Sequence, residues 1–205
     1  MRVINTNQYT SDNLKGLSRI PFLHALAIQN AEQYQLLLKQ THIIQFESHE
    51  VLLEQGSEQS EFYAVISGRL DVLADNHVVG HVSAGQLSGV FSLLNNTPRS
   101  ATLRASGVNG TNIIVINFRL FGELNDFSFF SVESKLCLYK EVEKFARWKL
   151  DAYVTLSQDG VMKTLLSNLQ PFEGKRDSLE ELTYLDDQVR RLSQLFTQMN
   201  KTYRT

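Results

Sequence analysis

Short apolar runs separated by turn residues occupy the middle of the chain, from residue 41 to residue 118. The runs read THIIQF, EVLLEQ, EFYAVIS, RLDVLAD, HVVGHV, SATLRA and NIIVINF, and glycine or asparagine stands between most of them. Such runs, with a turn every ~8 to 12 residues, are typical of an antiparallel sandwich or barrel and not of a βαβ sheet. We therefore predict an α+β fold centred on an antiparallel, jelly-roll-like β-roll (a double-stranded β-helix). A tight type I′ hairpin is expected at Asn109-Gly110, because both residues tolerate positive φ.

Helical spacing replaces this pattern on both sides of the predicted roll. Pro21 sits where a helix can begin, and apolar residues follow it at helical spacing, so we predict one or two short helices over 21–40. Residues 128–156 read as one long helix. Its heptad a and d positions hold Phe129, Val132, Leu136, Tyr139, Ala146, Leu150 and Tyr153, with Glu143 as the polar exception.

A second apolar line, formed by Leu138, Val142 and Phe145, lies on another side of this long helix. Two stripes indicate a helix that docks on its own domain while it pairs with a partner. We therefore predict a homodimer through 128–157. The alternative is a core helix that is buried without pairing.

The C-terminal tail carries two further helical patterns. A short helix over about 160–169 is bounded by Asp159 and Pro171, and Ser178 with Glu181 forms a capping box that starts a longer helix. An a/d seam follows at Leu182, Leu185, Val189, Leu192, Phe196, Met199 and Tyr203. Such a seam requires a helix partner, either within this chain or across a dimer, and predicts a possible protein contact through 178–203. The expected organisation is thus 1–127 for the roll with its N-terminal helices, 128–157 for the connecting helix and 158–205 for the tail.

Composition narrows the functional classes. Of the 205 residues 42% are apolar and 20% are charged, which is ordinary for a folded globular protein. The net charge of −2 gives no global attraction to nucleic acid or to anionic membranes. Cys137 is the only cysteine, and the chain shows neither a secretory h-region nor an apolar run of about 20 residues. We therefore expect a cytoplasmic protein with no membrane contact.

The stretch from Gly85 to Arg104, GQLSGVFSLLNNTPRSATLR, carries the candidate chemistry. A glycine-led short helix between strands presents free backbone N–H groups and a positive dipole end, which suit an anion. Arg99 follows Gly89 by ten residues, and its guanidinium can hold a phosphate bidentately. Ser100 adds a hydroxyl donor.

In its context this stretch resembles the phosphate-binding cassette of cyclic-nucleotide-binding domains, as in the catabolite activator (Crp/Fnr-like) family and kinase regulatory subunits. The resemblance covers about residues 14–156 and includes LKGLSRIPFLHAL, VLLEQGSEQSEFYAVISGRLDVL and SLLNNTPRSATLRA. It implies a β-roll flanked by helices, often regulatory and often dimerised through the following helix. It also implies a ligand-binding set formed by Gly89, Val90, Phe91, Arg99 and Ser100.

The sequence departs from the family at one position of this set. The family motif is Phe-Gly-Glu, and its glutamate accepts the ribose 2′-hydroxyl, whereas this chain has Ser88-Gly89-Val90. A buried hydroxyl without a partner costs about 1–3 kcal/mol, so we expect weak or lost cyclic AMP binding. Phe-Gly-Glu does occur at 121–123, but it follows the last predicted strand and is not the cassette.

Other kinds of site lack support in the sequence. No Gly-x-Ser-x-Gly elbow, Walker loop or Rossmann loop occurs, and the histidines have no companions at metal-ligand spacing. We therefore predict no enzyme, no metal and no cofactor, apart from a possible cyclic nucleotide or other small anionic effector. The expected function is a regulatory sensor that signals through helices to a partner.

The alternative is a shortened transcription regulator with a divergent DNA-binding tail, in which LEEL and DDQVRRLSQL would form the two helices of a helix-turn-helix. DNA binding is possible but not favoured. Leu185 runs directly into Asp186 without a turn, and basic and acidic residues balance in 158–205, whereas a recognition surface has a basic excess.

Overall fold

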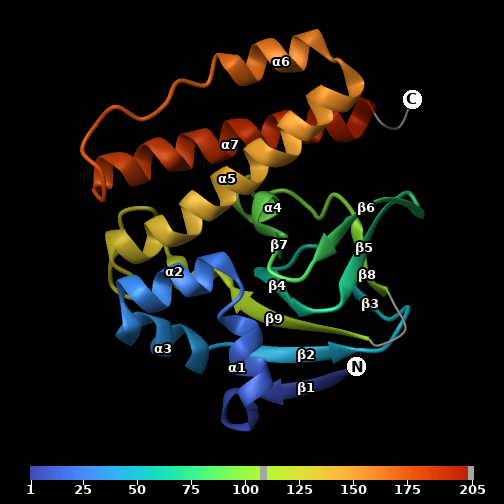
Figure 1. Cartoon of the computed structure of the whole chain (residues 1–205), viewed down its shortest axis with the longest axis vertical. Coiled ribbons are helices and arrows are strands. Elements are labelled where there is room, and N and C mark those ends of the chain that lie inside the picture. The colour runs from blue at the N-terminus through green and yellow to red at the C-terminus, as the bar shows by residue number, and fades with distance from the viewer. Residues whose placement is uncertain (107–109, 203–205) are drawn as a thin grey trace. The chain divides into compact units, whose positions relative to one another are not determined.

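The computed structural model describes residues 1–106 and 110–202, with side chains described as far as Met199. It divides into two compact units (Figure 1), which we call the roll unit, Met1–Gly122, and the helical unit, Glu123–Thr205. Asn109 of the predicted hairpin and Tyr203 of the predicted seam lie outside the described residues.

The roll unit contains two antiparallel sheets. One has the strand order β1-β2-β9-β4-β7 and the other has the order β3-β8-β5-β6. The strands are β1 (Arg2–Asn5), β2 (His42–Phe46), β3 (Val51–Leu53), β4 (Glu61–Ser67), β5 (Arg69–Ala74), β6 (His77–Ser83), β7 (Leu87–Ser88), β8 (Thr102–Ser106) and β9 (Thr111–Asn117). The predicted antiparallel, mixed helix-and-sheet fold is confirmed, and each predicted run contains a strand. The short strands β1 and β7 were not predicted, because neither carries an alternating pattern of its own.

Side chains from both sheets form the core of the roll. It contains Phe46, Leu53, Tyr63, Val65, Leu70, Val82, Leu103, Ala105, Ile113 and Val115, all buried. Burial of alternate positions on paired strands fixes their register, since a shift by one residue would turn the apolar set outward.

The N-terminal helices of the roll unit are α1 (Ser11–Leu17), α2 (Pro21–Gln29) and α3 (Ala31–Lys39), with 3-10 turns η1 (Thr6–Gln8) and η2 (Phe118–Phe121). The helical prediction for 21–40 is confirmed as two helices. The break falls at Asn30, whose side chain caps α3 by accepting from the Gln33 amide at 3.0 Å. Phe22 of α2, Phe62 of β4, and Phe118 and Phe121 of η2 form an aromatic cluster with ring centroids 5.9–6.3 Å apart.

The helical unit consists of α5 (Val132–Ser157), α6 (Gly160–Ser167) and α7 (Leu179–Thr202). The prediction that the long helix begins at residue 128 is wrong. It begins at Val132, because the Ser131 side chain accepts from the Ser134 amide and caps it there. Phe129 therefore precedes the helix and is not part of a helical stripe. The short helix is confirmed with Asp159 as its cap, although it ends at Ser167.

Helix α7 packs along α5 within the same chain. The seam residues Leu182, Leu185, Val189, Leu192 and Met199 are buried, as are Leu136, Tyr139, Ala146, Leu150 and Tyr153 of α5. Of the two kinds of helix partner that the a/d seam allowed, the structure contains the intrachain one. Figure 1 shows α5 and α7 running in the same direction, with α6 returning between them in sequence.

At the start of α7 only one of the two hydrogen bonds of the predicted capping box is present. The Ser178 hydroxyl accepts from the Glu181 amide at 3.2 Å, but the Glu181 carboxylate accepts from the Asp177 amide at 2.7 Å. Glu181 is 2% exposed and also pairs with Arg176 at 2.9 Å and with Lys140 of α5 at 3.1 Å. Burial alone raises the pKa of this carboxyl, but the donors from Arg176, Asp177 and Lys140 outweigh it and hold the pKa below its usual value.

The two compact units differ from the predicted three-part organisation in where they divide. The division follows Gly122, because residues 123–131 pack with α5: the Lys135 ammonium donates to the carbonyls of Glu123 at 2.5 Å and Leu124 at 3.2 Å. The segments 128–157 and 158–205 lie in one unit, since α7 packs on α5. Across the described residues, no helix combines the length and the apolar character needed to span a bilayer.

Candidate functional site

The loop that follows β7 builds the site from a left-handed glycine and one helical turn. Gly89 has φ 86° and precedes α4 (Val90–Leu94). Residues other than glycine rarely adopt this backbone conformation, which costs an L-residue about 1–2 kcal/mol. The chain then turns back through Asn95 and reaches Arg99 before β8 begins.

Backbone hydrogen bonds fix Arg99 against the turn after β3. Its amide donates to the Ser57 carbonyl at 2.9 Å, and its carbonyl accepts from the Gly56 amide at 2.8 Å. Arg99 is thus held on both sides of its own Cα, and its side chain points inward.

The Arg99 side chain is 4% exposed and lies over the start of α4. Its Nη1 donates to the Gly89 carbonyl at 2.6 Å and to the Ser92 hydroxyl at 2.7 Å, and its Nη2 donates to the Glu61 carbonyl. The guanidinium carbon lies 5.8 Å from the centre of the Tyr63 ring. The Nε atom is buried and has no hydrogen-bond partner.

This arrangement leaves a buried cation without a paired carboxylate. Among the described ion pairs none involves Arg99, and its acceptors are two carbonyls and one hydroxyl. Burial lowers the pKa of Arg99, and the neighbouring Tyr63 and Glu61 partly oppose that effect. A buried positive charge with no carboxylate in direct contact attracts an anion.

Tyr63 of β4 supports the guanidinium from the core side. Its hydroxyl donates to the Gln59 side chain at 2.6 Å. Burial raises the pKa of Tyr63 to about 12, although the charge of Arg99 lowers it. The phenol therefore stays neutral at ordinary pH.

The space between Gly89 and Arg99 is filled by the guanidinium itself. A Cβ added at Gly89 would lie 2.7 Å from Arg99 Nη1. Glycine is thus required here both by the positive φ and by the closeness of the arginine.

The structure brings two of the predicted site residues into direct contact, and the other three differ in their exposure. Gly89 and Arg99 are in direct contact. Val90 is 5% exposed and packs into the protein, Phe91 is half-buried, and Ser100 is exposed. The Val90 side chain is aliphatic and offers no hydrogen-bond acceptor.

Sequence reasoning missed three groups that hold the guanidinium. The Glu61 contact is through its backbone carbonyl, which no residue type signals. Tyr63 reads only as an inward residue of a strand. Ser92 had a usable signal, since a hydroxyl three residues after a helix-start residue faces back toward it.

Two clefts lie elsewhere in the described parts of the chain. One, of about 520 Å³, lies in the helical unit and is lined by Lys140, Glu143, Arg147, Leu169, Pro171, Phe172, Arg176, Asp177, Glu181, Tyr184 and Leu185. The other, of about 700 Å³, is lined by Met1, Arg2, Gln45, Phe46, Glu47, Ser48 and Gly110. Neither is lined by residues of the predicted set. Within the described residues, no three His, Cys, Asp or Glu side chains are grouped to hold a metal.

The Phe-Gly-Glu sequence at 121–123 has a structural role. Phe121 ends η2 and packs in the aromatic cluster, and Gly122 follows with φ 60°. The motif lies after β9, as the sequence indicated.

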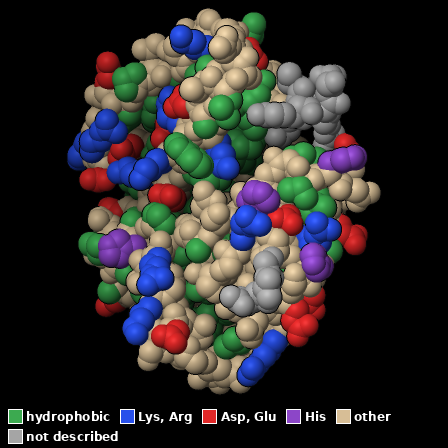
Figure 2. Space-filling model, turned by 45° about the vertical axis from the view of Figure 1, so that its right-hand side comes forward, with side chains coloured by type: hydrophobic (Ala, Val, Ile, Leu, Met, Phe, Trp, Pro, Cys, Tyr) green, Lys and Arg blue, Asp and Glu red, His purple; other side chains and the backbone are tan. Residues whose placement is uncertain are grey.

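The helix-turn-helix of the alternative prediction would need a turn near residues 185–186. Helix α7 is continuous from Leu179 to Thr202, across the expected turn at 185–186. Arg190 pairs with Asp186 at 2.9 Å and Arg191 with Asp187 at 2.8 Å, both within the helix. On the face that Figure 2 shows, basic and acidic side chains are interspersed. These features give no support to DNA binding.

Known proteins resemble the part of the chain that contains this site. Residues 43–124 match the family model of the cyclic nucleotide-binding domain. A cGMP-dependent protein kinase of Plasmodium berghei is 38% identical over 66 residues, which covers 32% of this chain and 8% of the kinase. A cAMP-dependent protein kinase regulatory subunit of Mycosarcoma maydis is 33% identical over 82 residues, covering 37% of this chain and 16% of that protein.

A solved structure shares the fold. The cyclic nucleotide-binding domain from Methylobacillus flagellatus has a TM-score of 0.52 at 20% identity and covers 66% of this chain and 83% of that one. The roll unit therefore contains a cyclic nucleotide-binding domain, by sequence over 43–124 and by fold. The chain spans less than a fifth of the two kinase-related proteins it matches. Membership of the catabolite activator branch stays a prediction.

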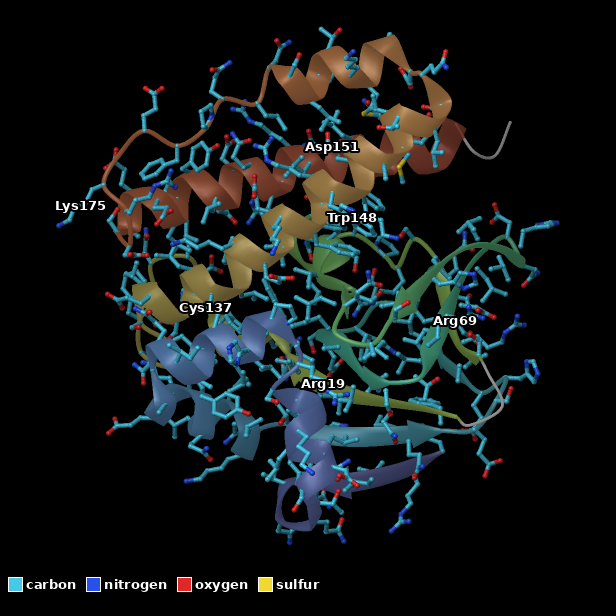
Figure 3. The ribbon with its side chains drawn as sticks, viewed as in Figure 1. Arg19, Arg69, Cys137, Trp148, Asp151 and Lys175 are labelled. Atoms are coloured by element: carbon cyan, nitrogen blue, oxygen red, sulfur yellow. The ribbon has the colours of Figure 1, made fainter. Side chains whose placement is uncertain are left out.

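Replacing Arg99 with alanine is expected to lower the free energy of unfolding by about 3 kcal/mol, because buried acceptors lose their donor. Urea unfolding followed by circular dichroism measures this change. Arg69, an exposed arginine of β5 (Figure 3), is the matched control, and Arg69→Ala should cost about 0.5 kcal/mol or less. Equal effects of the two variants would contradict the buried position of Arg99.

The raised pKa of Tyr63 predicts a loss of stability in alkali. The fold favours the neutral phenol, so its contribution is complete below the usual pKa of about 10 and disappears as the pH rises toward about 12. Between pH 9 and 12 the free energy of unfolding should therefore fall in both proteins, but in Tyr63→Phe the decrease should be smaller by up to about 2 kcal/mol. Urea unfolding at a series of pH values tests this, and parallel curves would refute it.

Proposed function

We propose that this chain is a non-enzymatic regulatory protein whose roll unit senses a small anionic effector through Arg99. The observation that supports this most directly is the buried guanidinium, which no carboxylate neutralises and whose Nε has no partner. The cyclic nucleotide-binding domain over 43–124 points to cyclic nucleotides as the first class of effector to test. Both kinase-related proteins carry a cyclic nucleotide in their names.

We further propose that ordinary cyclic AMP binds weakly. Val90 is buried and has no acceptor for a ribose 2′-hydroxyl. In addition, a phosphate that binds through Nη1 or Nη2 competes with the acceptors that these atoms already have at Gly89, Ser92 and Glu61. Each hydrogen bond lost in this exchange offsets one that the phosphate gains.

In this proposal the helical unit carries the response. Only residues 123–131 separate the roll unit from α5 in sequence. An effector that binds better to one arrangement of this connection shifts the population toward it. A protein partner of the 178–203 segment would meet the outer side of α7, because the seam is buried within the chain. A cytoplasmic location stays a prediction.

The proposed weakness at Val90 can be tested by restoring the acceptor. Val90→Glu is expected to raise the affinity for cyclic AMP about tenfold to a hundredfold, because the carboxylate accepts the 2′-hydroxyl. Isothermal calorimetry with cyclic AMP, cyclic GMP and cyclic dinucleotides measures this for the natural protein and the variant.

The matched ligand for this experiment is 2′-deoxy cyclic AMP, which lacks the hydroxyl and should gain nothing from Val90→Glu. The matched variant is Val90→Leu, which keeps an apolar side chain and should leave affinity for cyclic AMP unchanged. An equal gain for the deoxy ligand would contradict the ribose explanation. No heat from any ligand with either protein would contradict effector sensing.

We also propose that two copies of this chain associate through α5. Most a and d side chains of α5 that the sequence assigned to a dimer are buried (Leu136, Tyr139, Ala146, Leu150 and Tyr153), whereas Trp148 is 56% and Leu156 is 80% exposed. Trp148 lies on α5 in Figure 3 and is the only tryptophan of the chain. An exposed indole on a helix is a common anchor of protein interfaces.

Sedimentation equilibrium is expected to give the mass of two chains. Trp148→Glu should shift it toward one chain, because a carboxylate in an apolar contact loses its hydration. Lys175→Glu, on the loop before α7, is the control and should leave the mass unchanged. A single-chain mass for the natural protein would refute the dimer.

A further inference from the structure

The guanidinium of Arg99 donates three hydrogen bonds to the protein itself. Arginine has five N–H groups, and those of Nη1 reach the Gly89 carbonyl at 2.6 Å and the Ser92 hydroxyl at 2.7 Å. Nη2 reaches the Glu61 carbonyl, and Nε is buried without a partner. A phosphate that binds bidentately requires two N–H groups on one edge of the guanidinium. Three of the five N–H groups, including both of those on Nη1, therefore already have acceptors in the protein.

Ser92 differs from the other two acceptors because it acts through its side chain. It lies three residues after Gly89, so its hydroxyl faces back to the start of α4, where it donates to the Gly89 carbonyl at 3.1 Å. The hydroxyl thereby accepts from Nη1 and donates to the same carbonyl that Nη1 contacts. Ser92, Gly89 and Nη1 form a closed ring of three hydrogen bonds.

Burial makes this ring an effective competitor for an anion. Arg99 is 4% exposed and Ser92 is half-buried, so water replaces the hydroxyl less readily than at a surface. The two carbonyls are fixed by the backbone of α4 and β4. The hydroxyl of Ser92 is the component that a side-chain change can remove.

We propose that Ser92 is a specificity-determining residue of this site: its hydroxyl holds Arg99 against the Gly89 carbonyl and weakens the binding of phosphate-bearing effectors. This inference rests on the proposed function. It adds a second cause of the proposed low affinity for cyclic AMP. Val90 acts on the ribose, whereas Ser92 acts on the phosphate. Inorganic phosphate, which has no ribose, therefore reports on Ser92 alone.

The central test is Ser92→Ala, titrated with inorganic phosphate and with cyclic AMP by calorimetry. Loss of one competing hydrogen bond should tighten the binding of both ligands about threefold to tenfold. Ser92→Thr keeps the hydroxyl and should bind as the natural protein does. A purely structural role of Ser92 would lower the melting temperature without tightening the binding of either ligand.

A second measurement does not depend on any ligand. Nitrogen-15 NMR of the arginine side chains, with Arg99 assigned by its absence in Arg99→Lys, follows rotation of the guanidinium about its Nε–Cζ bond. Hydrogen bonds to Nη1 slow this rotation, so Ser92→Ala should accelerate it severalfold, whereas Ser92→Thr should not.

The two measurements separate failure of this inference from failure of the proposed function. Unchanged rotation in Ser92→Ala overturns the role of Ser92, whatever binds. Faster rotation with measurable but equal affinities overturns it as well, and leaves effector sensing intact. Faster rotation with no binding of phosphate or any cyclic nucleotide to either protein overturns effector sensing, and with it the competition by Ser92.

Discussion

The guanidinium of Arg99 is a full positive charge that is 4% exposed and faces two carbonyls, one hydroxyl and an aromatic ring. A charge at this depth is tolerated only where dipoles or counter-ions replace its hydration. That requirement ties together segments far apart in sequence: β4 supplies Glu61 and Tyr63, and the start of α4 supplies Gly89. The left-handed glycine, the short helix and the turn at 56–57 are arranged around this one side chain.

The proposed weak binding of cyclic AMP draws on the same contacts. Three N–H groups of Arg99 already have acceptors in the protein, whereas its Nε has none. Val90 is buried and has no acceptor of its own. If both features lower the affinity, their effects multiply in the dissociation constant, since independent free energies add.

The helical unit shows a different way of meeting a sequence requirement. Its two heptad seams, on α5 and α7, bury each other's apolar side chains within one chain. At one end the contact is fixed by Glu181, which joins α7 to Lys140 of α5 and to Arg176 of the preceding loop. Because Glu181 is buried, loss of either partner would leave a charge without hydration. The i,i+4 pairs on the surface of α7 contribute little to stability.

Local sequence patterns were enough to predict the class of fold, the positions of most of the longer strands and helices, and the place of Arg99 in a glycine-led cassette. These follow from local periodicity, turn residues and a short motif, all of which act over a few neighbouring residues. The packing of α7 on α5 could not be predicted in this way, because a heptad pattern specifies a contact but not the chain that supplies it. The contacts of Arg99 could not be predicted either. Two of its acceptors are backbone carbonyls, which every residue has, so only the path of the chain through space brings them to the guanidinium.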